Sequence, residues 1–107
     1  MRKSVRSCVA LAAVFSLAGV VGFAQSSGEA TYKSKCASCH GATGMADSGA
    51  GKAMKVRPVT DPDVKGMSEA QMITVTTDGK GKMPAYKGKL TDDQIKDSVS
   101  YFRSLAK

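Results

Sequence analysis

Two cysteines three residues apart, followed at once by a histidine, constrain this chain more than any other feature. They stand in the stretch KCASCHGATG as Cys36, Cys39 and His40, and His40 is the only histidine of the 107 residues. Large apolar side chains are few, because beyond residue 24 there are one phenylalanine, three tyrosines and no tryptophan. A domain this small needs help to bury a stable core. Whatever binds at the cysteines is therefore expected to supply part of that core.

The first 24 residues have the composition of a cleaved export signal. A basic start precedes an apolar run over residues 9–21, which is short for a bilayer span, and small residues flank Phe23 as signal peptidase requires. We expect cleavage after Ala24, so that residues 1–24 are a signal peptide and residues 25–107 form one domain in the periplasm. An uncleaved membrane anchor is the alternative interpretation.

The charge that remains after this cleavage is moderately positive. Residues 25–107 hold 13 basic and 9 acidic side chains, a net charge of +4. No arginine-rich helix and no basic stretch interleaved with aromatic residues is present, so the sequence gives no support to nucleic-acid binding. The charge instead favours a partner with an acidic surface, and ordinary solubilising charge is the alternative.

The first part of the domain is expected to form a helix followed by a long loop. Gly28, Tyr32, Cys36 and Cys39 are spaced as one face of a helix over residues 28–39. Residues 41–66 have no clear period, many glycines and few large apolar side chains. Unstructured loops of that length are uncommon in compact domains and are usually functional or disordered.

Two further helices are predicted by their capping residues. Ser68 and Thr91 each precede a glutamine by three residues, which is the pattern of a capping box at a helix start. Gly79 is expected to end the second helix, and the third helix is expected to have one apolar face. No pair of strands is convincing, so the fold class is all-α, with three or more helices and long loops wrapped around one bound group.

In an exported chain, Cys-x-x-Cys-His is typical of covalent haem attachment. Two thiols on one helical face can each add to a vinyl group of the same porphyrin edge, and His40 then binds the iron. A redox-active dithiol is expected in a βαβ unit, which is absent from the pattern. A structural zinc site needs four ligands, and beyond residue 24 there are only two cysteines and one histidine. We therefore predict one covalently bound haem c, attached through Cys36 and Cys39.

The other face of the iron needs a ligand that is not histidine. Met83 stands in a loop well beyond His40, and Pro84 after it fixes the backbone. We expect Met83 to be the second axial ligand, and the alternative is a methionine that only covers the porphyrin. Lysine is disfavoured because its ammonium group is strongly hydrated. The other methionines of the domain are expected to fill the core or pack on the haem: Met45, Met54, Met67 and Met72.

Taken in order, these segments resemble the class I monohaem cytochromes c, the small c-type cytochromes of bacteria. CASCHG lies near the start of the domain, GKGKMPAYKGKL follows in its second half, and TDDQIKDSVSYFRSL closes the chain. The resemblance implies the all-α cytochrome c fold, in which the first and last helices cross at the haem edge. Gly28 would permit that crossing, with Tyr32 packed against Tyr101 or Phe102.

The resemblance also implies contacts around the haem. Family members place a proline carbonyl from the segment after the haem motif against the haem-binding histidine. Pro58 is the candidate for this contact with His40, and Pro62 lies close to it in the sequence. Arg57 is a candidate for contact with a haem propionate, and a solvated loop charge is the alternative.

A haem iron bound by histidine and methionine has no open position for a substrate. The expected function is therefore one-electron transport by a monomer and not enzymatic catalysis. Four lysines flank Met83 and are expected to steer the protein to redox partners with acidic docking surfaces: Lys80, Lys82, Lys87 and Lys89. The alternatives are a haem subunit of a larger dehydrogenase or oxidase, and a haem enzyme or sensor in which Met83 binds loosely.

Overall fold

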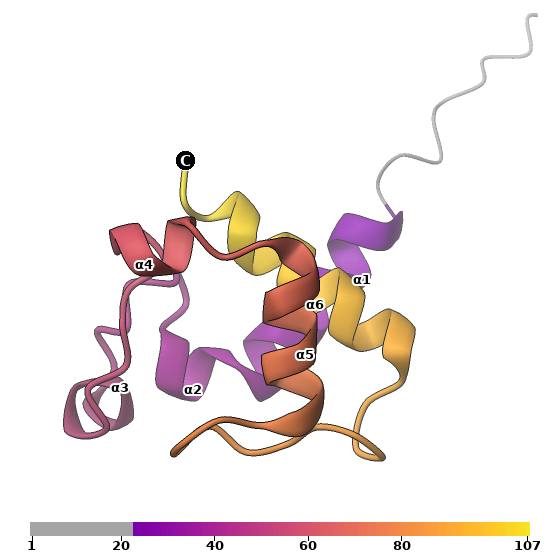
Figure 1. Ribbon diagram of the computed structural model, residues 1–107. Helices are drawn as coiled ribbons and strands as arrows, with labels where there is room; N and C mark the ends of the chain where they lie inside the picture. The colour runs from indigo at the N-terminus through magenta and orange to yellow at the C-terminus, as the bar shows by residue number, and fades with distance from the viewer. Residues whose placement is uncertain (1–22) are drawn as a thin grey trace, which may run out of the picture.

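Residues 23–107 are described by a computed structural model, and in them the backbone is helical without any sheet (Figure 1). Backbone bridges pair only single residues, Lys80 with Met83 and Lys87 with Leu90. The predicted all-α class is therefore confirmed. The helices of this part are α1 (Phe23–Lys35), α2 (Ala37–His40), α3 (Gly49–Ala53), α4 (Pro62–Lys65), α5 (Glu69–Asp78) and α6 (Asp92–Ser104).

The predicted signal peptide falls almost wholly outside the described residues, since α1 begins at Phe23. Its cleavage after Ala24 therefore stays a prediction. Among the helices that are described, none combines the length and the apolar character needed to cross a bilayer.

Helices α1 and α6 cross in close contact, as the sequence predicts. A side chain at Gly28 would place its Cβ 2.4 Å from the backbone oxygen of Asp97, so only glycine fits at this crossing. Tyr32 is 1% exposed, and its ring centroid lies 5.3 Å from that of Tyr101 and 6.0 Å from that of Phe102. Both aromatic residues thus meet Tyr32, and this contact anchors the core beside the cysteine motif.

The first predicted helix differs from the observed one. The sequence pattern indicates a single helix over residues 28–39, whereas α1 ends at Lys35 and α2 begins at Ala37. Cys36 lies in the turn between them, and its carbonyl accepts the amide of Cys39, only three residues on, at 3.2 Å. This tighter turn redirects the chain, which a count of helical positions could not detect.

The segment over residues 41–66 is not the structureless loop that the sequence predicts. It contains α3 and α4, each opened by a side chain that accepts a backbone amide at its N-terminus. The Ser48 hydroxyl accepts from the Gly51 amide at 3.0 Å, and the Asp61 carboxylate accepts from the Asp63 amide at 2.9 Å. Helices of four and five residues are too short to show an apolar period.

Helices α5 and α6 begin where their capping residues predict, and α5 also ends at the predicted glycine. The side chains of Ser68 and Thr91 each accept a hydrogen bond from the backbone amide of the glutamine three residues on. Each glutamine side chain in turn accepts one from the backbone amide of its capping residue. Gly79 ends α5 with a φ of 77°. Ile95 and Val99 of α6 are buried, so its predicted apolar face points into the core.

Candidate cofactor site

One cavity of about 370 Å³ brings together the residues that the sequence singles out. Cys36, Cys39 and His40 lie on one part of its wall, and Met83 with Pro84 on another. The remaining wall is mainly apolar and comes from α5, α6 and the segments that precede α5. Its apolar members are Met54, Val56, Val64, Met67, Met72, Val75, Val99 and Phe102.

The chemistry of the cysteine motif fits covalent haem attachment. Both thiols are free and half-buried, and burial together with the nearby Cys39 raises the pKa of Cys36 to about 11. Burial lowers the pKa of His40, which favours the neutral imidazole that a metal requires. The His40 ring meets Phe102 edge-on, with 5.2 Å between the ring centroids. Two thiols and a neutral imidazole at an apolar cavity are the groups that haem c needs.

Helix α2 is held in place by hydrogen bonds to the carbonyls at its end and just beyond it. The Tyr32 hydroxyl donates to the Gly41 carbonyl at 2.6 Å, and the Ser48 hydroxyl donates to that of Ser38 at 2.7 Å. The Ala46 amide donates to the carbonyl of His40 at 2.8 Å. These bonds satisfy carbonyls that a helix end leaves without partners, and they fix the histidine backbone.

A tight turn places Met83 at the cavity. Lys80 and Met83 exchange both backbone hydrogen bonds, at 3.1 and 3.0 Å. The Tyr86 amide then donates to the Thr76 carbonyl of α5 at 3.0 Å, and the Tyr86 hydroxyl donates to the Lys35 carbonyl of α1 at 3.0 Å. Tyr86 thus connects the turn over residues 80–83, called the methionine turn below, to α5 and to α1.

The other methionines divide into two groups. Met54, Met67 and Met72 line the cavity, in agreement with their predicted role as apolar filling. Met45 does not line it: its side chain is 43% exposed, and its sulfur accepts a hydrogen bond from the Thr60 hydroxyl at 3.8 Å. The expectation that Met45 could pack on the cofactor therefore finds no support in the cavity wall.

Pro58 does not line the cavity. Its carbonyl accepts the Asp61 amide at 2.9 Å, while Nδ1 of His40 is buried without a hydrogen-bond partner among the described residues. The contact between Pro58 and His40 thus stays a prediction. Buried polar atoms usually have a hydrogen-bond partner, so Nδ1 of His40 is a place where an additional partner is expected.

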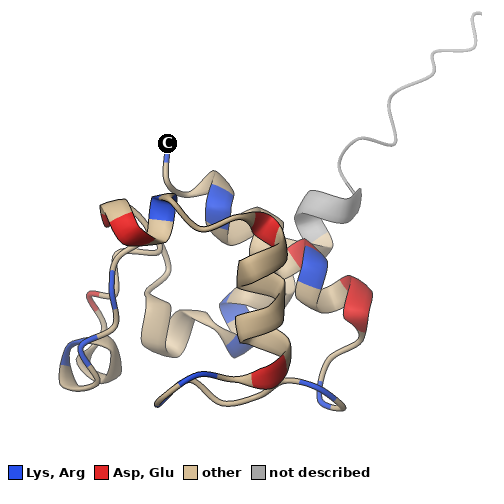
Figure 2. Cartoon of the chain, viewed as in Figure 1, with Lys and Arg blue, Asp and Glu red and all other residues tan. Residues whose placement is uncertain are grey.

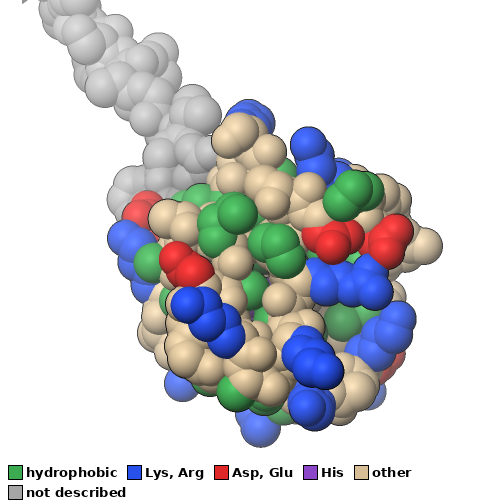
Figure 3. All heavy atoms as spheres, turned by 90° about the vertical axis from the view of Figure 1, so that its left-hand side faces the viewer, with side chains coloured by type: hydrophobic (Ala, Val, Ile, Leu, Met, Phe, Trp, Pro, Cys, Tyr) green, Lys and Arg blue, Asp and Glu red, His purple; other side chains and the backbone are tan. Residues whose placement is uncertain are grey.

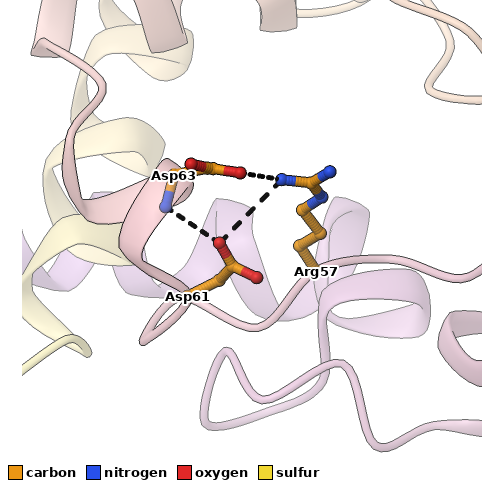
Figure 4. A network of polar contacts seen from close by, with 3 residues as sticks. All are labelled: Arg57, Asp61 and Asp63. Carbon is orange, nitrogen blue, oxygen red and sulfur yellow. Dashed lines mark hydrogen bonds and ion pairs between the residues drawn. The ribbon is translucent and has the colours of Figure 1, made fainter.

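Arg57 reaches the cavity wall while pairing with two carboxylates. Its guanidinium forms a short ion pair with Asp63 and a second one with Asp61 at 4.0 Å (Figure 4). The Arg57 side chain is 60% exposed, so these pairs are worth little in stability. Contact with a haem propionate stays a prediction, and it would have to compete with Asp63.

The four lysines around Met83 lie in two different places. Lys80 and Lys82 line the cavity, whereas Lys87 and Lys89 do not. Figure 2 shows basic residues toward both ends of the loop between α5 and α6. In Figure 3, which faces the α3 and α4 side of the molecule, basic side chains and some acidic ones lie around a group of apolar ones. Of these four lysines, Lys80 and Lys82 are therefore the two placed to border a bound group, and Lys35 of α1 lines the same cavity.

Sequence reasoning did not identify four polar residues of the cavity wall: Lys35, Thr76, Ser98 and Tyr86. For Ser98 a signal was present, because it lies between Ile95 and Phe102 on the apolar face of a predicted helix. For Thr76 the β-branched run of α5 hid which face is buried. Tyr86 is close to Met83 in the chain, but only the turn at Lys80 brings both to the cavity.

Known proteins resemble this chain in sequence and in structure. The sequence model of the family described as "Cytochrome C oxidase, cbb3-type, subunit III" matches residues 23–102. Cytochrome c-551 of Halorhodospira halochloris is 36% identical over 81 residues, which cover 72% of this chain and 95% of the relative. Cytochrome c6 of Leptolyngbya boryana is 39% identical over 74 residues, which cover 69% and 84%.

Two solved structures have the same fold. The KustC0563 c-type cytochrome superposes with a TM-score of 0.68 at 27% identity, over 75% of this chain and 98% of that one. Cytochrome c6 from the diatom Phaeodactylum tricornutum superposes with a TM-score of 0.59 at 29% identity, over 77% and 93%. Both superpositions extend over nearly the whole length of the solved protein.

Helices around one apolar cavity, with two thiols and an imidazole in its wall, define a c-type cytochrome. The chain belongs to the cytochrome c family, as a small monohaem member of class I. It carries one covalently bound haem c, and Cys36 and Cys39 stand in the Cys-x-x-Cys-His position of that family. It is an electron carrier and not an enzyme.

Proposed function

We propose that this cytochrome is a periplasmic one-electron carrier in which His40 and Met83 bind the haem iron from opposite faces. Cys36 and Cys39 hold the porphyrin by thioether bonds. The observation that supports this best is the shared cavity: His40 and Met83 come from distant segments and line the same apolar space as both thiols. When bound there, haem c supplies a one-electron couple between ferric and ferrous iron.

The protein's own side chains set the conditions for this couple. Two axial side chains leave no position at which a substrate could reach the iron. The apolar wall keeps water out and favours the less charged reduced state. The basic side chains of Lys80 and Lys82 at the wall attract an acidic redox partner to the same edge. The site is thereby suited to rapid exchange of single electrons and to no bond-making reaction.

Periplasmic location is supported by the leader-like composition of residues 1–24. Thioether formation also needs a host that matures c-type cytochromes. Intact mass of the protein from such a host should correspond to residues 25–107 plus one haem. A mass that retains the first 24 residues would favour the uncleaved anchor.

Met83 as axial ligand is tested by the ferric absorption spectrum. A methionine-bound low-spin haem has a weak near-infrared charge-transfer band, and Met83→Ala should abolish it. Met45→Ala is the matched control, because Met45 is exposed and off the cavity, and it should keep the band. If Met67→Ala lost the band and Met83→Ala kept it, the axial ligand would be Met67 and not Met83. A high-spin spectrum of the unaltered protein would contradict a closed iron.

Docking through the cavity-side lysines is tested by ionic strength. Electron transfer to an acidic redox protein should slow as salt rises, because screening weakens the attraction between the partners. Replacing Lys80 and Lys82 with Gln should flatten this dependence more than replacing Lys87 and Lys89, which lie off the cavity. Lys96→Gln, on exposed α6 surface, is the control. Equal effects of both pairs would reject a docking site centred on the cavity.

A second candidate function is that of a haem subunit in a larger oxidase. It is favoured by one observation, since the matching family model is described as a subunit of cytochrome c oxidase. The two candidates differ in assembly, because a free carrier is a monomer. Gel filtration and co-purification from the native organism separate them: a stable complex with other chains supports the subunit.

A further inference from the structure

Two buried hydroxyl groups line the haem cavity, one on each of two helices. Thr76 of α5 is 7% exposed and Ser98 of α6 is 3% exposed. Each hydroxyl donates its hydrogen to the carbonyl four residues earlier in its own helix. Thr76 Oγ1 donates to Met72 at 2.8 Å, and Ser98 Oγ donates to Gln94 at 2.7 Å. A hydroxyl has one hydrogen, so neither group has another to offer the cavity.

The oxygen atoms of both groups remain as acceptors without a donor. Within residues 27–107, whose side chains the structure describes, no hydrogen bond is donated to either oxygen. A backbone carbonyl fixes the hydrogen of each group along the helix, so the oxygen, the negative end of the O–H dipole, is the part of the hydroxyl that can still act on a charge in the cavity. In surroundings of low dielectric constant such a fixed dipole acts on a nearby charge more strongly than in water.

The charge of the haem differs between its two oxidation states. The ferric form has one more positive charge than the ferrous form, and negative dipole ends beside it stabilise the ferric form. We propose that Thr76 and Ser98 lower the reduction potential of the haem c by presenting their oxygen atoms to it. The inference depends on haem c occupying this cavity, which is a property of the family, and not on Met83 being the axial ligand.

Thr77 provides an internal comparison on the same helix. Its hydroxyl also donates to the carbonyl four residues earlier, that of Ile73, at 2.8 Å. Thr77 does not line the cavity, and it is only half-buried. Thr76 and Thr77 therefore share residue type, helix and kind of hydrogen bond, and differ in whether the residue lines the cavity.

The test is a redox titration of the mature holoprotein and its variants. Thr76→Val removes the oxygen at nearly constant volume and should raise the potential. We expect roughly a twofold shift of the one-electron equilibrium, which is about 18 mV at 59 mV per tenfold change. Ser98→Ala should act similarly, and the double variant should give roughly a fourfold shift, since the two dipoles act on one charge independently.

Three controls separate the dipole from packing. Thr77→Val and Ser100→Ala, which alter positions off the cavity, should leave the potential unchanged. Thr76→Ser keeps the hydroxyl while removing the methyl group, and it should keep the potential near that of the unaltered protein. If the potential rose as much in Thr76→Ser as in Thr76→Val, the effect would be one of packing, and the proposal would be overturned.

The absorption spectrum of each variant keeps this test apart from that of the axial ligand. Potentials are compared between proteins with the same near-infrared band, whichever side chain gives rise to it. If Thr76→Val alters the spectrum, Ser98→Ala on the other helix decides the question. An unchanged or lower potential in a variant with an intact spectrum overturns the proposal.

Discussion

The wall of the cavity that presents His40 is built differently from the wall that presents Met83. Around His40, the carbonyls at the end of α2 accept bonds from Tyr32, Ser48 and Ala46, and α3 packs directly behind them. Around Met83, the chain forms one tight turn without a helix. Backbone bonds to α5 and the Tyr86 hydroxyl hold this turn in place.

This difference indicates which axial position the protein holds more firmly. The histidine backbone cannot move without disturbing α3 and the buried ring of Tyr32. The methionine turn can move by breaking a few bonds at the surface, because most of its residues are exposed. We expect a disruptive substitution in the wall around His40 to unfold the domain. One in the wall around Met83 should release the methionine while the domain stays folded.

The largest effect is expected from Gly51→Ala, in the histidine wall. A Cβ at Gly51 would lie 2.3 Å from the Cys39 carbonyl oxygen and 2.7 Å from that of Ala46, so α3 would be forced off α2. We expect a loss of about 3 kcal/mol in the free energy of unfolding, measured by denaturation of the holoprotein. Gly49→Ala, in the same helix, has no atom within 4 Å of its Cβ and should be close to neutral. Equal losses in both variants would contradict a tight contact at Gly51.

A smaller and more local effect is expected from Gly79→Ala, in the methionine wall. Gly79 has a φ of 77°, and its Cβ would lie 2.9 Å from the Met83 carbonyl oxygen. We expect a loss of about 2 kcal/mol, together with loss of the near-infrared band at a lower temperature than global unfolding. Gly88→Ala has a similar φ of 79° without a close atom, so it should lose only about 1 kcal/mol and keep the band. If Gly79→Ala lost the band only on global unfolding, the two walls would be equally firm.

The sequence predicted the parts of this arrangement that local patterns encode. The capping boxes of Ser68 and Thr91 and the cysteine motif each depend on a few neighbouring residues. The glycine at the α1–α6 crossing contacts Asp97, which is distant in sequence, and it was expected only from the family resemblance. The break at Cys36 and the close contact at Gly51 depend on residues that are distant in sequence or on the exact turn geometry. Periodicity carries no information on either, so they emerged only from the structure.

The same limit of local patterns applies to the residues around the cavity. Met83 was predicted as the ligand from its proline and its place in the chain, but the turn that presents it needs Gly79 and the pairing of Lys80 with Met83. Lys87 and Lys89 were grouped with Lys80 and Lys82 because they are close in sequence, and the turn separates them. Sequence distance is a poor guide wherever a loop reverses direction.

The smallest effect expected, and the one that depends on pH, comes from the two tyrosines that support the walls. Burial, as the largest cause, raises the pKa of Tyr32, and burial also raises that of Tyr86. A phenol whose pKa is higher in the folded state contributes stability that is complete below its unfolded pKa of 10.0 and is lost as pH rises above it. Burial persists when thioethers replace the thiols, so this direction holds in the holoprotein.

Tyr32→Phe should therefore lower stability at neutral pH and also flatten its decline above pH 10. The neutral-pH loss is expected to be about 1–2 kcal/mol, because the buried Gly41 carbonyl loses the hydroxyl that bonds it at 2.6 Å. Tyr86→Phe should lose less, because its bond to the Lys35 carbonyl is exposed. Denaturation of each protein at pH 7 and pH 11, compared with that of the unaltered protein, measures both quantities. If Tyr86→Phe lowered stability more than Tyr32→Phe, the methionine wall would be the firmer of the two.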